Sequence, residues 1–444
     1  LFIMFWHKLA GQGIFMPTLR ITAKWTNHPW QRHKICEEDF GGNLYKYKDY
    51  YQVKEPVRIR MSRYRLLDEK ETYKPVARSI PGKPLMKILI IGALNYNPER
   101  FCAWEEAGCQ LYGYWYPVPS MAHESIGPFP FGHIETIPHG ADWTERVRDI
   151  CPDLIYLCFC CSSLEFVYDS MMELRKAGVH VPFVWHLKEG PQLCMRFGTW
   201  PKLMELYELS AGNIITNRRT KEWYDLFLPT GKPYLILDQE MPKKEYFERP
   251  FSPKISASDG EIHTVVIGRM IGISVEDMRR LAAHRIHVHL YSASYYRQKN
   301  TGNNLYGRVA QGYFHVHAYC PNEKWVEEFS RYDAGWLHAG HSRNRGDLFR
   351  AMWDDLNIPA RVGTLAAAGL PMILRRNTEH IVASKELSEQ YGIGILYDSI
   401  TELATQLHDK DFMDILTRNM QEHRMEFTMD AHTPKLIRFF QSLI

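Results

Sequence analysis

The chain has 444 residues, of which 45% are hydrophobic and 24% are charged, and these ordinary globular values exclude a fibrous, low-complexity or disordered protein. No run approaches the ~20 apolar residues needed to cross a bilayer, so we expect no transmembrane segment. The net charge of +3 hides an asymmetry, because residues 1–85 carry 16 Lys and Arg against 8 Asp and Glu while the remainder is mildly acidic. Such a basic segment favours an anionic partner.

The nine cysteines do not form the pattern of a secreted disulfide framework, and four of them crowd one apolar segment over residues 151–161. The opening run LFIMFW is short and has no basic segment before it, which argues against a secretory signal peptide. We therefore predict a cytoplasmic protein. Peripheral attachment at the inner membrane face is the alternative that the basic residues leave open.

Residues 1–85 are predicted to be a basic, aromatic N-terminal extension without a clear period. Only residues 58–65, RIRMSRYR, alternate basic and apolar residues as a half-exposed strand does. Three roles stay open for the extension. It could wrap the first domain with its Arg and Lys stems, contact an anionic membrane, or bind nucleic acid through phosphates and stacking.

Residues 86–237 alternate apolar strand-like runs with helical patterns. The first run, LMKILIIG, is apolar except for Lys87, which is typical of a parallel strand covered on both faces. Further strands are expected at residues 110–116, 152–160, 180–186 and 212–217, and helices at residues 98–108, 143–150, 164–177 and 200–209. This alternation predicts βαβ units and a parallel sheet, which we expect to form the acceptor domain.

The polar residues 238–261 are predicted to be a linker, a second α/β domain to cover residues 262–410, and a helical tail to cover residues 411–444. Strands are expected at residues 262–268, 286–292, 313–319, 334–338, 370–375 and 393–397, and helices at residues 275–284, 323–331, 360–368, 378–390 and 399–408. The fold class is thus α/β, with two consecutive Rossmann-like parallel-sheet domains. Ligands are expected in the cleft between the domains, beyond the carboxyl ends of the strands.

Two loops of the first domain are candidates for lining this cleft. The loop after the first strand, G-A-L-N, ends in Asn95; it is not GxGxxG, so a nicotinamide enzyme is disfavoured. The loop after FVWH combines His186, Lys188 and Glu189, which can bind sugar hydroxyls or an anion. A satisfied buried histidine beside a solvated lysine is the alternative.

The second domain places cations after its strands. Arg269 follows the strand-ending Gly268, and its guanidinium suits a diphosphate. Arg361 lies in the first turn of a predicted helix, whose N-terminus favours phosphate. The basic loop HAGHSRNRGD, which contains His338 and Arg345, is either a donor-phosphate or acceptor loop or a plain surface loop.

Four motifs follow one another in the second half of the chain: V-x-G-R at residues 266–269, D-A-G-x-x-H at 333–338, P-A-R-V-x-x-x-A-A-A-G-L-P at 359–371 and Y-G-I-G-I-L-Y at 391–397. In this order and spacing they resemble the retaining glycosyltransferases of the GT-B fold, the glycogen-synthase-like enzymes that use nucleotide sugars. The resemblance covers about residues 86–444 and is best over residues 262–444.

The resemblance also implies roles for single residues. The family's G-R arginine contacts the donor diphosphate and matches Arg269, and a basic residue near the donor matches Arg361. A histidine of the family's N-terminal domain approaches the transferred sugar, and His186 resembles it by position. Where the family has a carboxylate for the nucleotide ribose, this chain has Thr364.

No metal site is predicted. The cysteines near residue 160 lack the spacing of a zinc site. His287, His289, His315 and His317 alternate along two strands, where an i, i+2 pair shares one face and could bind a metal. We interpret them as packing residues of the sheet.

Together these features predict a hexosyltransferase-type enzyme without a bound cofactor. It would move a sugar from a UDP- or GDP-sugar to a carbohydrate, lipid-linked or other hydroxyl acceptor, with retention. The donor side would comprise the residues after the second domain's strands, and the acceptor side Asn95, Lys188 and Glu189. Three alternatives stay open: a non-catalytic module that binds a nucleotide sugar or a polymer, a sugar-nucleotide 2-epimerase, and a nucleic-acid-modifying glycosyltransferase.

Overall fold

The computed structural model describes residues 60–62, 65–67, 83–93, 98–116, 134–238, 240–298 and 304–444. The short strands β1 (Arg60–Ser62) and β2 (Arg65–Leu67) form a two-stranded sheet, and β1 lies inside the strand predicted over residues 58–65. The rest of the predicted extension up to residue 82, and with it the proposed anionic contact, lies outside the described residues.

The first half of the chain forms a seven-stranded parallel sheet. Its order is β5-β4-β3-β6-β7-β8-β9. The strands are β3 (Met86–Gly92), β4 (Cys109–Trp115), β5 (Glu135–Thr136), β6 (Leu154–Phe159), β7 (Phe183–Leu187), β8 (Gly212–Ile215) and β9 (Tyr234–Ile236). The five predicted strands are confirmed, and β5 and β9 add two edge strands that the sequence pattern did not indicate.

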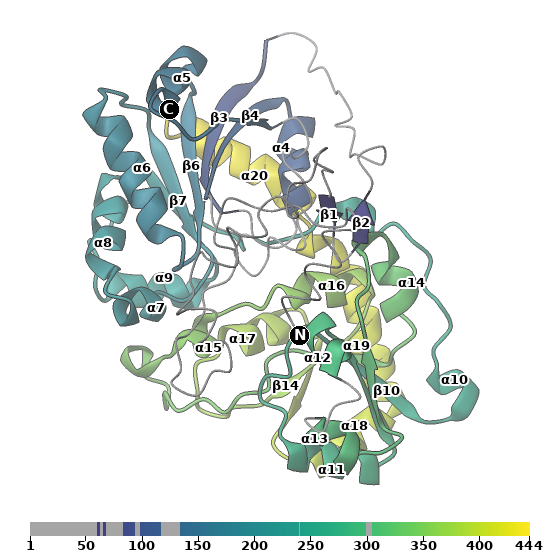
Figure 1. Cartoon of the computed structure of the whole chain (residues 1–444). Helices are drawn as coiled ribbons and strands as arrows, with labels where there is room; N and C mark the ends of the chain where they lie inside the picture. The colour runs from purple at the N-terminus through teal and green to yellow at the C-terminus, as the bar shows by residue number, and fades with distance from the viewer. Residues whose placement is uncertain are drawn as a thin grey trace, which may run out of the picture. The chain divides into compact units, whose positions relative to one another are not determined.

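Helices cover both faces of this sheet (Figure 1). They are η3 (Pro98–Phe101), α4 (Cys102–Glu106), α5 (Trp143–Ile150), α6 (Leu164–Lys176), α7 (Gln192–Arg196), α8 (Trp200–Leu209) and α9 (Arg218–Asp225). In α6, Leu164, Val167, Met171 and Leu174 are buried at the three- and four-residue spacing of one helix face. Every residue of β6 is buried, because helices cover the sheet on both sides.

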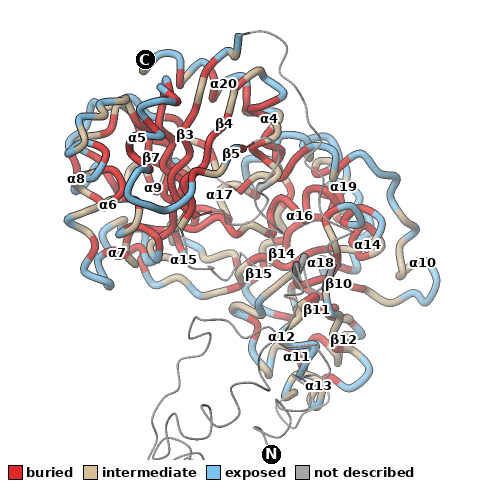
Figure 2. The backbone as a smooth tube through the Cα atoms, turned by 45° about the horizontal axis from the view of Figure 1, so that its top comes forward, coloured by how far each residue is buried: buried red, intermediate tan, exposed pale blue. Residues whose placement is uncertain are grey.

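The second half forms a six-stranded parallel sheet with the order β12-β11-β10-β13-β14-β15. The strands are β10 (Ile262–Ile267), β11 (Ile286–Tyr291), β12 (Phe314–His317), β13 (Ala334–Trp336), β14 (Met372–Arg375) and β15 (Gly394–Tyr397). All six predicted strands are therefore confirmed. Figure 2 shows buried residues along the strands of both sheets and exposed residues on their outer loops.

The helices of the second half alternate with its strands, and two short helices lie in the predicted linker. The linker contains η5 (Lys244–Tyr246) and α10 (Ser256–Asp259). The remaining helices are α11 (Val275–Ala283), α12 (Ala293–Gln298), α13 (Leu305–Val309), η6 (Asn322–Lys324), α14 (Trp325–Phe329), η7 (Leu348–Arg350), α15 (Trp353–Leu356), α16 (Arg361–Ala367), α17 (Ala383–Gln390) and α18 (Ile400–His408).

The predicted C-terminal tail is helical and returns to the first sheet. It comprises α19 (Lys410–His423), η8 (Arg424–Phe427) and α20 (Met429–Gln441). Phe440 of α20 packs edge-on against Trp104 of α4, with ring centroids 5.5 Å apart. The apolar face of α20 thus completes the core beneath β3, with which Leu436 and Phe440 share one buried cluster (Figure 1).

In both sheets the strand order reverses next to the first strand, at β3/β6 and at β10/β13. Such a switch point leaves a crevice at the carboxyl ends of the two strands, because the connections on either side run in opposite directions. The loops that follow β10 and β13 are therefore where a ligand of the second sheet is expected.

Candidate functional site at the strand ends

Gly268 follows β10, with a backbone φ of +91°. Its N–H donates to the carbonyl of Tyr291, 2.8 Å away, which keeps the turn against β11. Side chains are rarely accommodated at such a φ, so glycine suits this position. The turn directs the chain into Arg269, whose side chain is exposed.

The Arg361 side chain is buried, 8% exposed, and holds two strand-end loops together. Its Nη2 donates to the carbonyl oxygen of Arg269 at 2.8 Å, and its Nη1 lies 3.4 Å from the carbonyl oxygen of Trp336, the last residue of β13. The structure thus brings Gly268, Arg269 and Arg361 together. In this conformation the guanidinium of Arg361 binds main-chain carbonyls of the two loops.

His338 follows β13 and faces the same two arginines. Its Nδ1 lies 3.4 Å from Oδ1 of Asp354, an ion-pair distance that is long for a hydrogen bond. Burial lowers the pKa of His338; Asp354 opposes this, but the charges of Arg361 and Arg269 add to the lowering, and the net shift is downward. The ring is therefore neutral at pH 7, beside a site of positive charge.

Asp354 is the residue that the sequence interpretation left without a role. It lies in α15 and its side chain is half exposed. The signal that could have found it is its place in the connection from β13 to α16, whose two ends carry His338 and Arg361.

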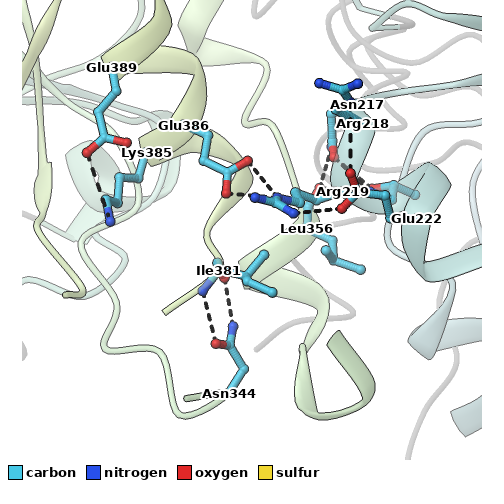
Figure 3. Close-up of polar contacts among 11 residues, drawn as sticks. Asn217, Arg218, Arg219, Glu222, Asn344, Leu356, Ile381, Lys385, Glu386 and Glu389 are labelled. Carbon is cyan, nitrogen blue, oxygen red and sulfur yellow. Dashed lines mark hydrogen bonds and ion pairs between the residues drawn. The ribbon is translucent and has the colours of Figure 1, made fainter. Parts of the chain in front are cut away.

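Two other predicted donor residues lie differently. Thr364 is buried within α16. Arg345 is exposed in the loop after β13, and its main-chain N–H donates to Nδ1 of His380 at 3.0 Å. Asn344 ties this loop to the segment after β14 through two hydrogen bonds with the main chain of Ile381 (Figure 3). Arg345 therefore belongs to a well-anchored surface loop.

His186, predicted to approach the transferred sugar, is only 1% exposed. Its Nε2 donates to the carbonyl of Leu237 at 2.9 Å, so Nδ1 accepts from the hydroxyl of Tyr156 at 2.8 Å. Burial, and then the charge of Arg100, holds the pKa of His186 well below its usual value. Both ring nitrogens have protein partners, which is the arrangement of the satisfied buried histidine that the sequence left as the alternative.

Lys188 is likewise buried and paired. Its Nζ lies 2.7 Å from Oδ1 of Asp238 and 3.3 Å from Oε2 of Glu240. Burial lowers the pKa of Lys188, but the attraction of Asp238 and Glu240 outweighs burial and raises it. Lys188 is therefore charged, and in this structure two carboxylates bind its ammonium group, so it is not the solvated lysine of the alternative interpretation.

The Glu189 carboxylate is bound by its neighbours in the fold. Its Oε2 accepts from the thiol of Cys161 at 2.7 Å and from the N–H of the same residue at 3.3 Å. The two loops after β6 and β7 are thereby joined. Asn95, the other predicted acceptor residue, lies outside the described residues.

The loops after β7 and β8 are bonded to the second half of the chain. Lys188 donates to the carbonyl of Ile358 at 3.0 Å, and Asn217 to that of Leu356 at 2.7 Å. The Arg219 Nε lies 2.8 Å from each carboxylate oxygen of Glu386 in α17 (Figure 3). These contacts fix the segment that leads into α16, and hence Arg361, against the first sheet.

Two kinds of feature are missing from the described parts of the chain. No cluster of three or more His, Cys, Asp or Glu side chains there could hold a metal ion. Nor does any helix in these parts have the length and hydropathy to cross a membrane.

No protein-family model and no curated protein matches the sequence. Among solved structures, sucrose-phosphate synthase from Thermosynechococcus elongatus matches with a TM-score of 0.56 and 11% identity, over 81% of this chain and 99% of that one. An α,α-trehalose-phosphate synthase (UDP-forming) from Burkholderia xenovorans, in complex with glucose-6-phosphate, matches with a TM-score of 0.50 and 9% identity, over 80% and 100% of the two chains. At these identities the likeness concerns the fold, and the chain has the two-sheet GT-B fold of these synthases.

Proposed function

We propose that the protein is a glycosyltransferase that transfers a sugar from a nucleotide-sugar donor to a hydroxyl acceptor. The observation that carries this proposal is the group of Gly268, Arg269 and Arg361 at the switch point of the second sheet, in a GT-B fold. Two guanidinium groups there supply the positive charge that a departing nucleoside diphosphate needs. The names of the two structural neighbours, both synthases of sugar phosphates, agree with this class.

The residues around the switch point would have different roles in binding the donor. The exposed side chain of Arg269 would bind the diphosphate directly, whereas Arg361 would position the Arg269 loop and add to the positive field. His338, neutral and next to both, would donate a hydrogen bond to a phosphate or sugar oxygen. Held in these positions, the groups can stabilise the negative charge that develops on the departing diphosphate.

Retention is the finer part of the proposal. The bond from the sugar C1 to the diphosphate oxygen breaks, and the acceptor oxygen bonds to C1 on the same face. The acceptor proton then passes to the departing phosphate oxygen, so the step requires no protein base. This agrees with the enclosed His186, which the transfer would not use. A UDP- or GDP-hexose is the proposed donor.

Replacing Arg269 with alanine is expected to weaken nucleoside-diphosphate binding roughly 10- to 150-fold, the loss of about 1.5–3 kcal/mol for a hydrogen bond between charged groups. The measurement is a thermal-shift titration with UDP, GDP and ADP and their sugars, in which the base that stabilises the wild type identifies the donor. Arg280→Ala is the matched control, because Arg280 is exposed on α11 and pairs only with Glu276 among the described ion pairs.

The enzyme proposal is tested separately by turnover of the stabilising nucleotide sugar, with the anomeric form of the product followed by NMR. Stabilisation without turnover would replace the enzyme by a binding module, and conversion of the donor to its 2-epimer would replace transfer by epimerisation. Equal binding by Arg269→Ala and Arg280→Ala would contradict the assigned site.

A further inference from the structure

Five histidines on one face of the second sheet form two hydrogen-bonded rows across β10, β11 and β12. In the first row, His263 Nδ1 lies 2.9 Å from His289 Nε2, and His289 Nδ1 lies 3.0 Å from His317 Nε2. In the second row, His287 Nδ1 lies 2.9 Å from His315 Nε2. We call the two rows the histidine ladder.

Each row of the ladder starts at a carboxylate. Oδ2 of Asp259 lies 2.9 Å from His263 Nε2, and Oε2 of Glu261 lies 2.8 Å from His287 Nε2. Rings directly opposite each other in the register stack instead of bonding: the centroids of His263 and His287 are 4.2 Å apart and nearly parallel. The rows thus bond diagonally across the strands and stack between them.

The carboxylates fix the direction of every hydrogen bond in the neutral ladder. A carboxylate can only accept, so the ring next to it donates from Nε2 and, being neutral, has a bare Nδ1. The following ring must then donate from its own Nε2 to that Nδ1, and the same holds for the ring after it. All five rings are therefore Nε2–H tautomers when neutral.

One added proton per row preserves all of these bonds. If the ring beside the carboxylate becomes doubly protonated, its Nδ1–H donates outward, and each later ring reverses its tautomer. A second proton in the same row cannot be placed this way, because two N–H groups then face each other at one link. That link is lost and the two rings repel.

The ladder lies beside groups that affect its charge. Those in contact with its rings or carboxylates, or bonded to such groups, are Arg285 before β11, Tyr291 in β11, Tyr313 before β12, Glu328 in α14, and Tyr332 and Asp333 before β13. The Asp259 and Glu261 carboxylates are the ones bonded directly to ladder rings.

We propose that the histidine ladder is an acid-sensitive clasp: each row accepts one proton without losing any of the hydrogen bonds named above, and further protonation releases the edge strand β12 from β11. This device goes beyond the proposed glycosyltransferase activity and does not depend on it. Among the strands that the structure describes, β12 lies at the edge of this sheet and pairs with β11 alone, so it is the strand to be released.

The direction of the pH effect follows from His289, in the middle of the first row, and His315, at the end of the second row. Burial, together with neighbouring histidines, lowers the pKa of His315 to about 4 and that of His289 to about 2. Unfolded, these rings take up a proton near pH 6.5. Between about pH 6.5 and 4 the unfolded chain thus binds more protons, so stability falls as the pH falls, by about tenfold in the unfolding equilibrium constant per pH unit for each ring.

The test measures urea unfolding between pH 8 and pH 4.5 for the full chain and for His289→Gln, which keeps a donor and an acceptor but does not titrate. In the variant, the unfolding equilibrium constant is expected to depend less steeply on pH, by about tenfold per pH unit, because one fewer proton is taken up on unfolding. His180→Gln is the control, because His180 is exposed in the first half of the chain. Equal pH dependence in His289→Gln and the wild type would overturn the proposal.

A second measurement needs no variant. Nitrogen-15 NMR of histidine side chains should show five Nε2–H tautomers at pH 8, and amide hydrogen exchange at pH 5 should accelerate in β12 relative to β14 after correction for intrinsic rates. Uniform exchange in the two strands, or Nδ1–H tautomers at pH 8, would also overturn the clasp.

Discussion

Replacing Lys188 with methionine should lower the free energy of unfolding by about 3–5 kcal/mol, the cost of leaving buried charge without its partner. The lysine is 6% exposed, and Asp238 and Glu240 lie within 3.3 Å of its Nζ. Burial raises the pKa of Glu240, although Lys188 opposes the shift. Without Lys188, that carboxyl would have to ionise in the interior or take up a proton. Urea denaturation followed by tryptophan fluorescence measures the loss.

The control for Lys188 is Lys202→Met. Lys202 also lies near two carboxylates, those of Glu165 and Asp169, but these are 66% and 69% exposed, so a loss of less than about 1 kcal/mol is expected. The triple variant Lys188→Met, Asp238→Asn, Glu240→Gln should recover part of the stability lost by Lys188→Met, since neither of the two carboxylates that face Lys188 then carries a charge. Equal losses for Lys188→Met and Lys202→Met would contradict the buried ion pair.

Replacing Gly92 with alanine should lower the free energy of unfolding by more than about 4 kcal/mol, a loss that only a few mechanisms such as a backbone conflict produce. Gly92 ends β3 with a φ of +142°, and a Cβ at this position would lie 1.8 Å from the carbonyl oxygen of Cys158 in β6. The neighbouring atom is main chain, so β3 and β6 would have to separate at the switch point of the first sheet. The yield of folded protein and the thermal midpoint by circular dichroism report the effect.

Gly140→Ala serves as the control for Gly92, because a Cβ there would meet no heavy atom within 4 Å. We expect a change within about 0.5 kcal/mol, as for surface substitutions generally. A Gly92→Ala protein as stable as Gly140→Ala would show that β3 and β6 do not approach this closely.

The apolar runs of the central strands made the fold predictable. LMKILIIG is apolar except for Lys87 because β3 lies between two layers of helices, and β6 is apolar for the same reason. β5 is two residues long and polar, and β9 is three residues at the sheet edge, so neither has a period to detect. The apolar face of α20 indicated that this helix packs against the protein, but not that it packs beneath β3, since a hydrophobic stripe does not specify what covers it.

The candidate site was predictable only where local sequence determines position. Gly268 and Arg269 directly follow a strand, so their place at the carboxyl edge followed from the strand itself. His186 also sits at a strand end, but the carbonyl that binds it belongs to Leu237, 51 residues later. The partners of Lys188 lie equally far along the chain, in a segment whose polar composition suggested a linker. Such pairings arise from tertiary packing and leave no local pattern.

The return of α20 to the first sheet also has a consequence for synthesis. Met429, Leu436, Ile437 and Phe440 complete the buried cluster that contains Ile88 and Ile90. At roughly 5–20 residues per second, the ribosome needs roughly 10–40 s to proceed from β9 to α20. During this interval the strands and the neighbouring helices of the first sheet have been made, but the face on which α20 packs is not yet covered by it. The nascent chain therefore exposes an apolar surface that a chaperone can bind. The hydrophobic core of the first half is complete only after the C-terminal helix α20 has been synthesised.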